Sequence, residues 1–467
     1  MNRKFYIVTT GCQMNVLDSE LAASLLISRG YTKADSQKEA EVILFNTCSV
    51  REHAEEKIYS ALGRLKHWKS FHPDGVIGVF GCMAQKDRWG IFRRAPHVDV
   101  VVGPGQLDRL PDLVDAASMG EGPQMAVSID RFRKRESAGA VRESFRQYDP
   151  IRLSETRPHL FQAMVRIMFG CDRFCSYCIV PSVRGPEQSR PADEIVREVK
   201  TLADQGCVEV TLLGQSVNLY KYSEGGKTAV LADLLERIDA IDGIRRVRFV
   251  SSYPTGMTDR LLQAVRDLPT AVPYLHVPAQ HGADSVLKRM NRHYSAAEYR
   301  DLTARIYETI PGAAITSDFI VGFCGETEDE FQETVRLVRD TRFKNSFIFK
   351  YSQRSGTKSA QLYDDDVPDE VKRRRNNELL AVQDAISAEA HRALVGETVE
   401  ILVDGHGKKE GQLSGRTPTD RIVVFDGPDS LIGTFQTMNI VGSTPFTLFG
   451  KVQSSSGTGS GHDAAAG

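Results

Sequence analysis

The sequence predicts an α/β protein of three domains: an N-terminal α/β domain, a larger core of six strand–helix units, and a small C-terminal β domain. Its 467 residues exceed what one hydrophobic core ordinarily organises, which favours two or three domains. Short apolar runs alternate with helical patterns through most of the chain, and strand-like alternation without helices returns only near the end. We place the N-terminal domain at 1–118, a linker at 119–156, the core with its terminal helix at 157–394, the last domain at 395–452 and a disordered tail at 453–467.

Three apolar runs in the N-terminal domain are each followed closely by a cysteine and then by a polar, helix-favouring stretch. The runs and their cysteines are Phe5–Val8 with Cys12, Val42–Phe45 with Cys48, and Val76–Phe80 with Cys82. Loops at the carboxyl ends of neighbouring parallel strands converge on one crevice in an open α/β sheet. Three thiolates would therefore meet at one point and bind three irons of a cluster, leaving the fourth iron open. The alternative is that the three are unrelated core cysteines.

Six predicted strands define the core, with helical segments such as Ala192–Gln205 and Ser295–Thr309 between them. The strands are Ala163–Met168, Val208–Leu213, Val247–Val250, Tyr274–Val277, Ala314–Val321 and Ser346–Lys350. This pattern resembles a partial (β/α)6 barrel. In such barrels the functional loops lie at the carboxyl ends of the strands.

A Cys-x3-Cys-x2-Cys run, Cys171, Cys175 and Cys178, follows the first of these strands. Three thiolates cannot complete a tetrahedral zinc site without a fourth ligand, whereas they suit three irons of a 4Fe–4S cube. The spacing resembles that of radical SAM enzymes, whose open iron chelates S-adenosylmethionine and passes it an electron. The resemblance implies that Tyr177 lies beside the adenine of the cofactor and that Gln215 reaches its methionine end. The alternatives are a zinc knuckle or a chance cluster for the triad, and a helix-capping loop amide for Gln215.

The surroundings of the other three cysteines resemble the cysteine boxes of the methylthiotransferase family, most closely its MiaB type. The matching segments are Gly11–Asn15 with Leu17–Glu20, Asn46–Glu52, and Gly81–Gln85. The match extends from about residue 3 to about residue 451, in the family's order. It implies two 4Fe–4S clusters, one on each cysteine triad, together with S-adenosylmethionine.

The family resemblance also implies the reaction. Carbon 2 of adenine is an unactivated aromatic C–H, and breaking it requires a radical that a cofactor supplies. The implied activity inserts a methylthio group at carbon 2 of isopentenylated adenosine next to the anticodon of tRNA. One S-adenosylmethionine yields the 5′-deoxyadenosyl radical, and a second methylates a sulfur held on the cluster of the N-terminal triad.

The implied partners are tRNA, an electron donor and a sulfur source, and we expect a monomer. A sibling enzyme acting on threonylcarbamoyl adenosine or on a ribosomal protein aspartate is one alternative. A non-catalytic, RNA-binding iron–sulfur protein is another.

The C-terminal region begins with a predicted long polar helix from Asp369 to about Leu394. Alternating apolar residues then predict strands at Val399–Val403, Arg421–Phe425 and Phe435–Ile440. This segment resembles a TRAM domain, a small antiparallel β-barrel that binds tRNA, so its RNA role rests on that resemblance.

Other chemically notable residues receive less specific predictions. His281 follows the fourth core strand, and we expect it behind the site rather than in acid–base catalysis. Cys324 stands where relatives usually carry proline and is expected to be buried and unligated, while Cys207 is expected to serve packing. Arg184 and Arg190 could contact substrate phosphate or base, or form structural ion pairs.

Two clusters of basic residues are candidate phosphate contacts: the segment 131–146, with Arg131, Arg133, Lys134, Arg135, Arg142 and Arg146, and the run Lys372–Arg375. A solvated linker and the polar face of a helix explain them equally well.

Composition describes an ordinary soluble protein. Hydrophobic residues make up 41% and charged residues 26%, and the net charge of −2 gives no sign of nucleic acid. Eight cysteines in a chain of this length do not form a disulfide framework, which fits a reducing compartment. We see no signal-peptide pattern and no apolar run of the roughly 20 residues that span a bilayer, so we expect a cytoplasmic protein.

Overall fold

The computed structural model describes residues 3–48, 52–127, 145 and 152–453. Its N-terminal part is a parallel six-stranded sheet in the order β2-β1-β3-β4-β5-β6. The strands are β1 (Lys4–Thr10), β2 (Thr32–Lys33), β3 (Val42–Thr47), β4 (Val76–Gly81), β5 (Val100–Val102) and β6 (Gln124–Ala126). Every residue of β3 and β4 is buried, as expected for parallel strands covered on both faces. β6 lies within the segment for which the sequence predicted a linker.

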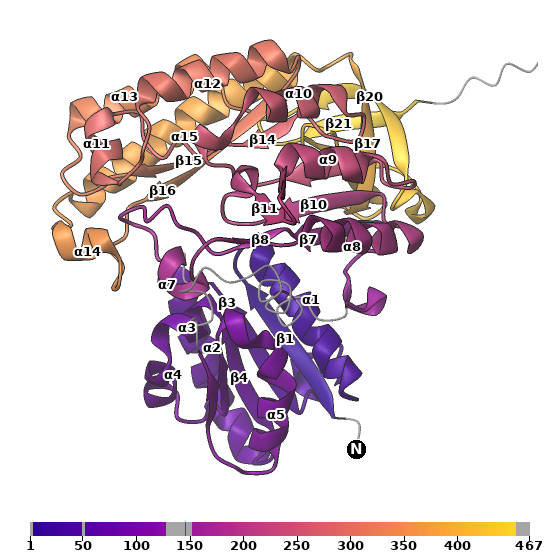
Figure 1. Cartoon of the computed structure of the whole chain (residues 1–467), viewed down its shortest axis with the longest axis vertical. Coiled ribbons are helices and arrows are strands. Elements are labelled where there is room, and N and C mark those ends of the chain that lie inside the picture. Colours follow the sequence, from indigo (N-terminus) through magenta and orange to yellow (C-terminus); the bar gives the residue numbers. More distant parts are fainter. Residues whose placement is uncertain (1–2, 49–51, 128–144, 146–151, 454–467) are drawn as a thin grey trace, which may run out of the picture.

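Helices cover both faces of this sheet (Figure 1). They are α1 (Gln13–Ser28) and α5 (Leu110–Ser118) on one face, and α2 (Glu52–Phe71), α3 (Cys82–Asp87) and α4 (Trp89–Arg94) on the other. Alternate residues of each strand feed the two cores, so that Leu44 packs with α1 and its neighbour Phe45 packs with α2.

The six core strands form a partial barrel, which confirms the predicted (β/α)6 architecture. They are β7 (Gln162–Arg166), β10 (Glu209–Leu213), β13 (Arg246–Phe249), β14 (Tyr274–His276), β15 (Ala314–Val321) and β16 (Asn345–Lys350). They pair in parallel as two arrays, β7-β10-β13 and β14-β15-β16. A parallel bridge between Val247 and Ala271, and a hydrogen bond from the Ser252 amide to the His276 carbonyl at 3.0 Å, join the arrays.

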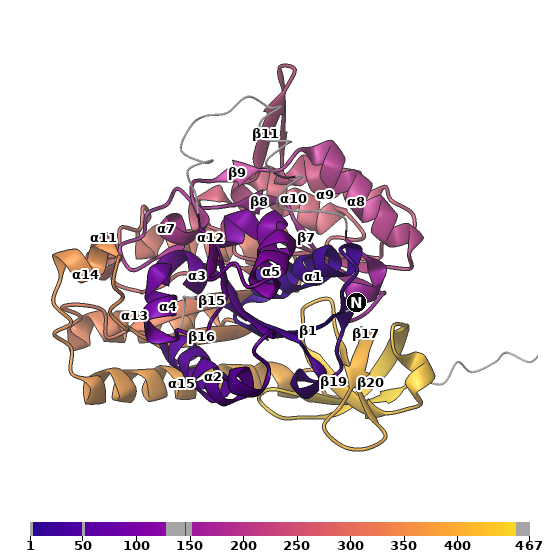
Figure 2. The same cartoon turned by 90° about the horizontal axis from the view of Figure 1, so that it is seen from below.

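An outer layer of helices covers the barrel (Figure 1). It comprises α8 (Ala192–Asp204), α9 (Leu231–Asp239), α10 (Asp259–Asp267), α11 (Asp284–Arg289), α12 (Ala296–Thr309) and α13 (Glu328–Thr341). A hairpin of β11 (Lys221–Glu224) and β12 (Lys227–Val230) protrudes from the body (Figure 2).

The long α15 (Asp369–Arg392) follows the short α14 (Lys358–Leu362) and leads from the barrel to the C-terminal domain (Figure 2). That domain is a closed barrel in the order β17-β18-β19-β21-β20. Its strands are β17 (Thr398–His406), β18 (Gln412–Arg416), β19 (Ile422–Asp426), β20 (Phe435–Ser443) and β21 (Leu448–Val452). The predicted antiparallel pairing holds for four of the five strand pairs, whereas β19 and β21 run parallel.

Arginines of β13 dock the C-terminal barrel onto the core barrel. Arg246 and Arg248 are two residues apart and point to the same side of the strand, while Val247 and Phe249 enter the hydrophobic core. Arg248 donates to the carbonyl oxygens of Thr417 and Pro418 at 2.9 and 3.0 Å, in the turn between β18 and β19. Among the described helices, none is long and apolar enough to cross a membrane.

A candidate active site between two cysteine triads

The three N-terminal cysteines follow three neighbouring strands at matched register. In the sheet, Thr10 of β1 pairs with Thr47 of β3, and Thr47 pairs with Gly81 of β4. Cys48 and Cys82 come directly after their strands, and Cys12 caps the start of α1. The thiols of Cys12 and Cys48 are hydrogen-bonded to each other. The convergence expected from the strand pattern is present.

Two glycines and two buried asparagines shape these loops. Gly11 has φ +145°, and a Cβ there would lie 2.8 Å from the Cβ of Cys48. Gly81 has φ +95°, and its Cβ would lie 2.5 Å from Oδ1 of Asn46. Asn15 and Asn46 are fully buried, and Asn15 Nδ2 donates to Asn46 Oδ1 at 2.9 Å. The Gly-Cys and Asn-Thr-Cys motifs therefore bring the three loops into close contact.

The pKa values of the Cys12 and Cys82 thiols are shifted in opposite directions. The hydrogen bond with Cys48, helped by the charge of Arg184, lowers the pKa of the Cys12 thiol to about 6 despite partial burial. Burial raises the pKa of Cys82, which Arg184 opposes. A guanidinium next to buried thiols favours their thiolate forms, which are the forms that bind iron.

The second triad lies in a loop that follows β8 (Met168–Phe169), at the carboxyl end of the first barrel strand. Backbone and side-chain hydrogen bonds hold the loop in place. The Cys171 amide donates to Gly185 at 3.1 Å, Ser176 Oγ donates to the Arg289 carbonyl at 2.8 Å, and Asn291 Nδ2 donates to the Phe174 carbonyl at 2.9 Å. Phe174 itself adopts φ +50°, a strained conformation for a bulky residue that often marks functional loops.

Polar groups from the loop after β10 and from the loop after α11 approach the second triad. Arg292 Nη1 donates to Cys175 Sγ at 3.3 Å, and Ser216 Oγ lies 3.9 Å from Cys171 Sγ. The Arg292 guanidinium lies 4.6 Å from the ring centroid of Tyr253. Burial raises the pKa of Cys178 to about 12, so this thiol needs a metal or a cation to ionise at neutral pH.

The predicted cofactor residues lie on the same face as this triad. Tyr177 is half-buried and packs in an apolar cluster with Phe323 and Tyr351. Oε1 of Gln215 is buried, and no described residue donates a hydrogen bond to it. Since a buried acceptor without a donor is unfavourable by about 1–3 kcal/mol, Gln215 is suited to accept from a bound ligand.

The two triads lie close to each other through the short helix α7 (Val180–Arg184), which starts directly after the second triad. Ile179 and Val183 pack with Cys82 in one buried cluster. Figure 1 shows α7 at the junction of the two domains, beside α3. In the described part of the chain, no three Cys, His, Asp or Glu side chains surround the position of a single metal ion. A 4Fe–4S cluster instead takes one thiolate per iron, and all six thiols offer such ligands.

The other predicted positions serve structure. His281 is 1% exposed; its Nδ1 accepts from the Ala283 amide at 3.1 Å, and its Nε2 lies 3.5 Å from a Glu326 oxygen. Cys207 is fully buried in the barrel core, and Cys324 is buried in the apolar cluster that includes Tyr177. Both predictions of buried, non-ligating cysteines agree with these positions.

Ion pairs account for most of the candidate phosphate-binding residues. Arg184 pairs with Asp18, Arg190 with Glu198, and Arg375 with Glu326. Within the second basic cluster, Lys372 pairs with Asp365. The first cluster, 131–146, lies outside the described residues except for position 145. For Arg184 and Arg190, these contacts favour structural ion pairing, one of the two alternatives.

Sequence reasoning did not identify Asp18, Arg166 and Arg292 as parts of the site. Asp18 accepts hydrogen bonds from both Arg166 and Arg184. The residues Asp18, Arg166 and Arg184 are each at most 2% exposed. Arg292 follows a helix in an unremarkable Met-Asn-Arg run. The only available signal was the placement of charged residues beside long apolar segments.

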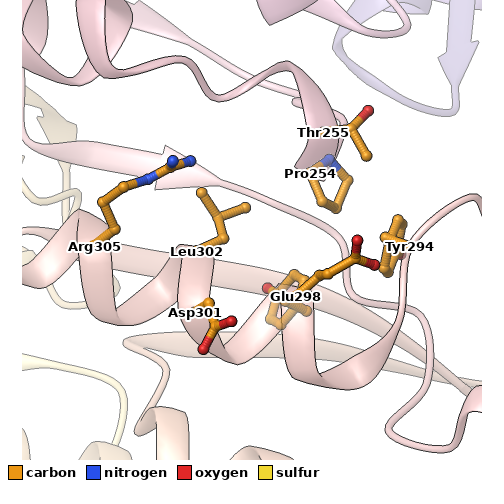
Figure 3. Close-up of a pocket in the computed structure, with 8 residues that line it drawn as sticks. Pro254, Thr255, Tyr294, Glu298, Asp301, Leu302 and Arg305 are labelled. Atoms are coloured by element: carbon orange, nitrogen blue, oxygen red, sulfur yellow. The ribbon is translucent and has the colours of Figure 1, made fainter.

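A cavity of about 310 Å³ lies between α12 and the turn η6 (Pro254–Gly256) (Figure 3). Glu298, Asp301 and Arg305 of α12 line it together with Tyr294. Arg305 donates to the Met257 carbonyl at 2.8 Å and pairs with Asp259 at 3.3 Å. The cavity's charged groups therefore tie α12 to α10.

Three family models match the chain in order along its length. They are the uncharacterised protein family UPF0004 at residues 4–103, the radical SAM superfamily at 165–338 and the TRAM domain at 392–453. A tRNA-2-methylthio-N(6)-dimethylallyladenosine synthase from Rhodopirellula baltica is 53% identical over 97% of this chain and 96% of that protein. A protein of the same name from Delftia acidovorans is 44% identical over 97% of this chain and 99% of that protein. The chain belongs to this synthase family.

Two solved structures resemble the fold of this chain. The radical S-adenosylmethionine methyltransferase TsrM from Kitasatospora setae, with cobalamin and a [4Fe-4S] cluster bound, matches with a TM-score of 0.53. The match has 14% identity and covers 89% of this chain and 81% of TsrM. The cobalamin-dependent radical enzyme OxsB matches with a TM-score of 0.50 over 82% of this chain and 56% of OxsB, at 11% identity. At such identities the likeness concerns the fold alone.

Proposed function

We propose that this protein is a tRNA methylthiotransferase that acts at carbon 2 of isopentenylated adenosine next to the anticodon. The observation that carries the proposal is the placement of two cysteine triads on either side of α7, in a chain of the synthase family. We assign one 4Fe–4S cluster to Cys171, Cys175 and Cys178, and an auxiliary cluster to Cys12, Cys48 and Cys82. A radical enzyme with a single cluster would have no use for the N-terminal triad of Cys12, Cys48 and Cys82.

A 4Fe–4S cluster with an open iron supplies the electron that converts S-adenosylmethionine to methionine and a 5′-deoxyadenosyl radical. The chain's own residues bind and orient the reactants. Gln215 would accept a hydrogen bond from the amino group of S-adenosylmethionine, and Tyr177 would form an apolar wall against its adenine. Arg292 donates to the Cys175 sulfur and holds that thiolate in place.

The substrate and partners follow from the same assignment. The C-terminal TRAM barrel contributes to tRNA binding, and an electron donor and a sulfur source complete the requirements of the reaction. The names of the relatives favour isopentenylated adenosine over the substrates of the sibling enzymes. The complete series of six strand–helix units with its radical SAM triad favours an enzyme over a non-catalytic iron–sulfur protein.

Anaerobic incubation followed by nucleoside mass spectrometry tests the proposal. The mixture contains the reconstituted full-length chain, a reductant, S-adenosylmethionine, sulfide and isopentenylated tRNA. We expect a methylthio mass increment on the isopentenyl adenosine. Formation of 5′-deoxyadenosine without that increment would assign the chain to a sibling's substrate, and formation of neither product by a fully loaded protein would overturn the enzymatic assignment.

Iron analysis of variants tests the assignment of the two triads. The wild type should bind about eight irons per chain, and C48A or C175A should lose about half of them, since each cluster holds about four. C207S is the matched control because Cys207 is equally buried but lies in the barrel core. An iron content unchanged in C48A would exclude the auxiliary site.

A further inference from the structure

Two opposite charges lie near each other beside the second triad without being paired. Arg173 lies in the loop between Cys171 and Cys175, and Glu187 lies three residues after the end of α7. Each has one buried atom, Nε of Arg173 and Oε2 of Glu187, with no hydrogen-bond partner among the described residues. The two side chains interact electrostatically, yet neither forms an ion pair with a described residue. A buried donor and a buried acceptor left open in this way are unfavourable unless a ligand satisfies both.

The backbone holds Glu187 against the loop that carries the second triad. Glu187 directly precedes β9 (Gln188–Ser189), which pairs antiparallel with β8 (Figure 2). Its amide donates to Asp172 Oδ1 at 3.2 Å. Gly170 has φ +74°, and a Cβ there would overlap the carbonyl oxygen of Pro186, so the two segments are in close contact.

Further contacts connect the pair to both triads. Glu187 interacts electrostatically with the thiol of Cys171. The Arg173 guanidinium lies 5.5 Å from the ring centroid of Tyr253, in the loop after β13. The helix α7, which ends three residues before Glu187, packs on the N-terminal triad. A base held between the triads would therefore have Arg173 and Glu187 within reach of one of its edges.

The Hoogsteen edge of adenine carries the two groups that this pair lacks. Its N7 accepts a hydrogen bond and its N6–H donates one. An isopentenylated N6 keeps one hydrogen, which lies on this edge when the chain is turned towards N1. Carbon 2 is on the far side of the ring, so contacts along the Hoogsteen edge leave it accessible. Proteins read unstacked RNA bases along such edges.

The adenine of S-adenosylmethionine offers the same edge, but the structure favours the substrate base. Tyr177, the residue assigned to the cofactor's adenine, packs with Phe323 and Tyr351, which follow β15 and β16. Arg173 instead lies beside Tyr253, which follows β13. The two positions belong to different parts of the barrel.

We propose that Arg173 and Glu187 are specificity-determining residues that bind the Hoogsteen edge of the substrate adenosine. Arg173 Nε donates to N7, and Glu187 Oε2 accepts from N6–H. The two contacts hold the base with carbon 2 turned away from them. The inference rests on the proposed function because it takes isopentenylated adenosine in tRNA as the substrate.

The test measures the dissociation constants of anticodon stem-loop RNAs with the full-length, iron-loaded chain, by anaerobic fluorescence anisotropy. Three RNAs differ only at the modified base: isopentenyl adenosine, its 7-deaza analogue, which lacks N7, and O6-isopentenyl inosine, in which an ether oxygen replaces N6–H. The variants are R173M and E187Q. R197M is the control because it removes a positive charge from α8, where the side chain is 71% exposed. Iron content and the dissociation constant of S-adenosylmethionine are measured for each protein.

The wild type should bind each analogue about tenfold more weakly than the parent RNA, since each analogue loses one hydrogen bond to a charged group. R173M should bind the parent RNA about tenfold more weakly than the wild type does, and should no longer distinguish it from the 7-deaza RNA. E187Q should bind the ether RNA more tightly than the parent RNA, because the new amide N–H donates to the ether oxygen. R197M should weaken all three RNAs by one common factor.

The reversed preference of E187Q supports the inference because loosened packing would weaken all three RNAs alike. If E187Q keeps the wild-type order, or if R173M still distinguishes the 7-deaza RNA, the inference is wrong. A tenfold loss of S-adenosylmethionine affinity in both variants would assign the pair to the cofactor and overturn it as well. If R173M binds no iron, the order of affinities in E187Q decides alone. Failure of the proposed function is seen separately, as the absence of a methylthio product from the parent RNA with the wild type.

Discussion

Replacement of Arg248 by methionine should release the TRAM barrel from the radical SAM barrel. The guanidinium donates to the carbonyl oxygens of Thr417 and Pro418 and to Glu209 Oε2, the last at 3.1 Å, in a site where its side chain is 7% exposed. Methionine preserves most of the apolar stem but leaves these acceptors without their donor. The pair with Glu209 lies within the radical SAM barrel, so only the two hydrogen bonds to the carbonyl oxygens of Thr417 and Pro418 cross to the TRAM barrel. Hydrogen bonds from a charged donor contribute about 1.5–3 kcal/mol each. We therefore expect the free energy of docking to fall by about 4 kcal/mol, which is roughly a thousandfold in the equilibrium.

Hydrogen exchange of the turn at 417–420 and limited proteolysis near residues 393–397 measure this loss directly. The matched control is R245M. Arg245 also reaches the TRAM barrel, pairing with Glu400 at 2.9 Å, but its side chain is 52% exposed. Exposed pairs contribute about 0.2–1 kcal/mol, so R245M should leave both readouts nearly unchanged. If R248M changes exchange and proteolysis no more than R245M does, the docking role of the buried arginine is wrong.

Three further predictions concern other parts of the molecule. Burial lowers the pKa of Lys344 from 10.5 to about 8. Between these pH values Lys344 is deprotonated in the folded state and protonated in the unfolded state. The free energy of unfolding therefore rises with pH by at most about 3 kcal/mol. K344M should abolish this rise, measured by urea unfolding at pH 7.5 and 10. Q215A should raise the KM for S-adenosylmethionine about tenfold in 5′-deoxyadenosine formation, without changing iron content, because one charged hydrogen bond of about 1.5 kcal/mol is lost. C324S should retain the iron content and activity of the wild type, and a loss of iron in this variant would make Cys324 a ligand.

The convergence of the N-terminal triad could be predicted because it depends on local patterns alone. Each cysteine follows a run of apolar residues, and parallel strands place the residues after them at one edge of the sheet. Given where each strand begins, Thr10, Thr47 and Gly81 lie opposite one another in the sheet. The six barrel strands were located for the same reason, since their apolar runs and the intervening helices repeat along the chain.

The electrostatic surroundings of the triads could not be predicted because they join distant parts of the sequence. Asp18 lies 166 residues from Arg184, and Arg248 lies 169 residues from Thr417. Nothing in the local sequence distinguishes these arginines from exposed ones. The strand β6 was missed for a related reason: three residues, Gln124–Ala126, form a strand only because β5 offers an unpaired edge.

The basic run at Lys372–Arg375 shows how charge alone misleads. Two of its members are at most 4% exposed, and their charges are paired with Asp365, in the loop before α15, and Glu326, in the loop after β15. Arg375 reaches Glu326, which lies 3.5 Å from His281, so the run fixes α15 against the loop after β14. A cluster of positive charge on one helix indicates phosphate binding only if those charges remain exposed.

The placement of α7 limits where the substrate base can lie. The helix has five residues, and at a rise of about 1.5 Å per residue it is only about 7.5 Å long. One end begins directly after Cys178, and the other end, at Val183 and Arg184, contacts Cys82 and Asp18. Clusters held by the two triads would therefore lie on either side of one short helix. A carbon atom that must be activated from one side and receive sulfur from the other would then lie between the triads, with both domains supplying walls of one site.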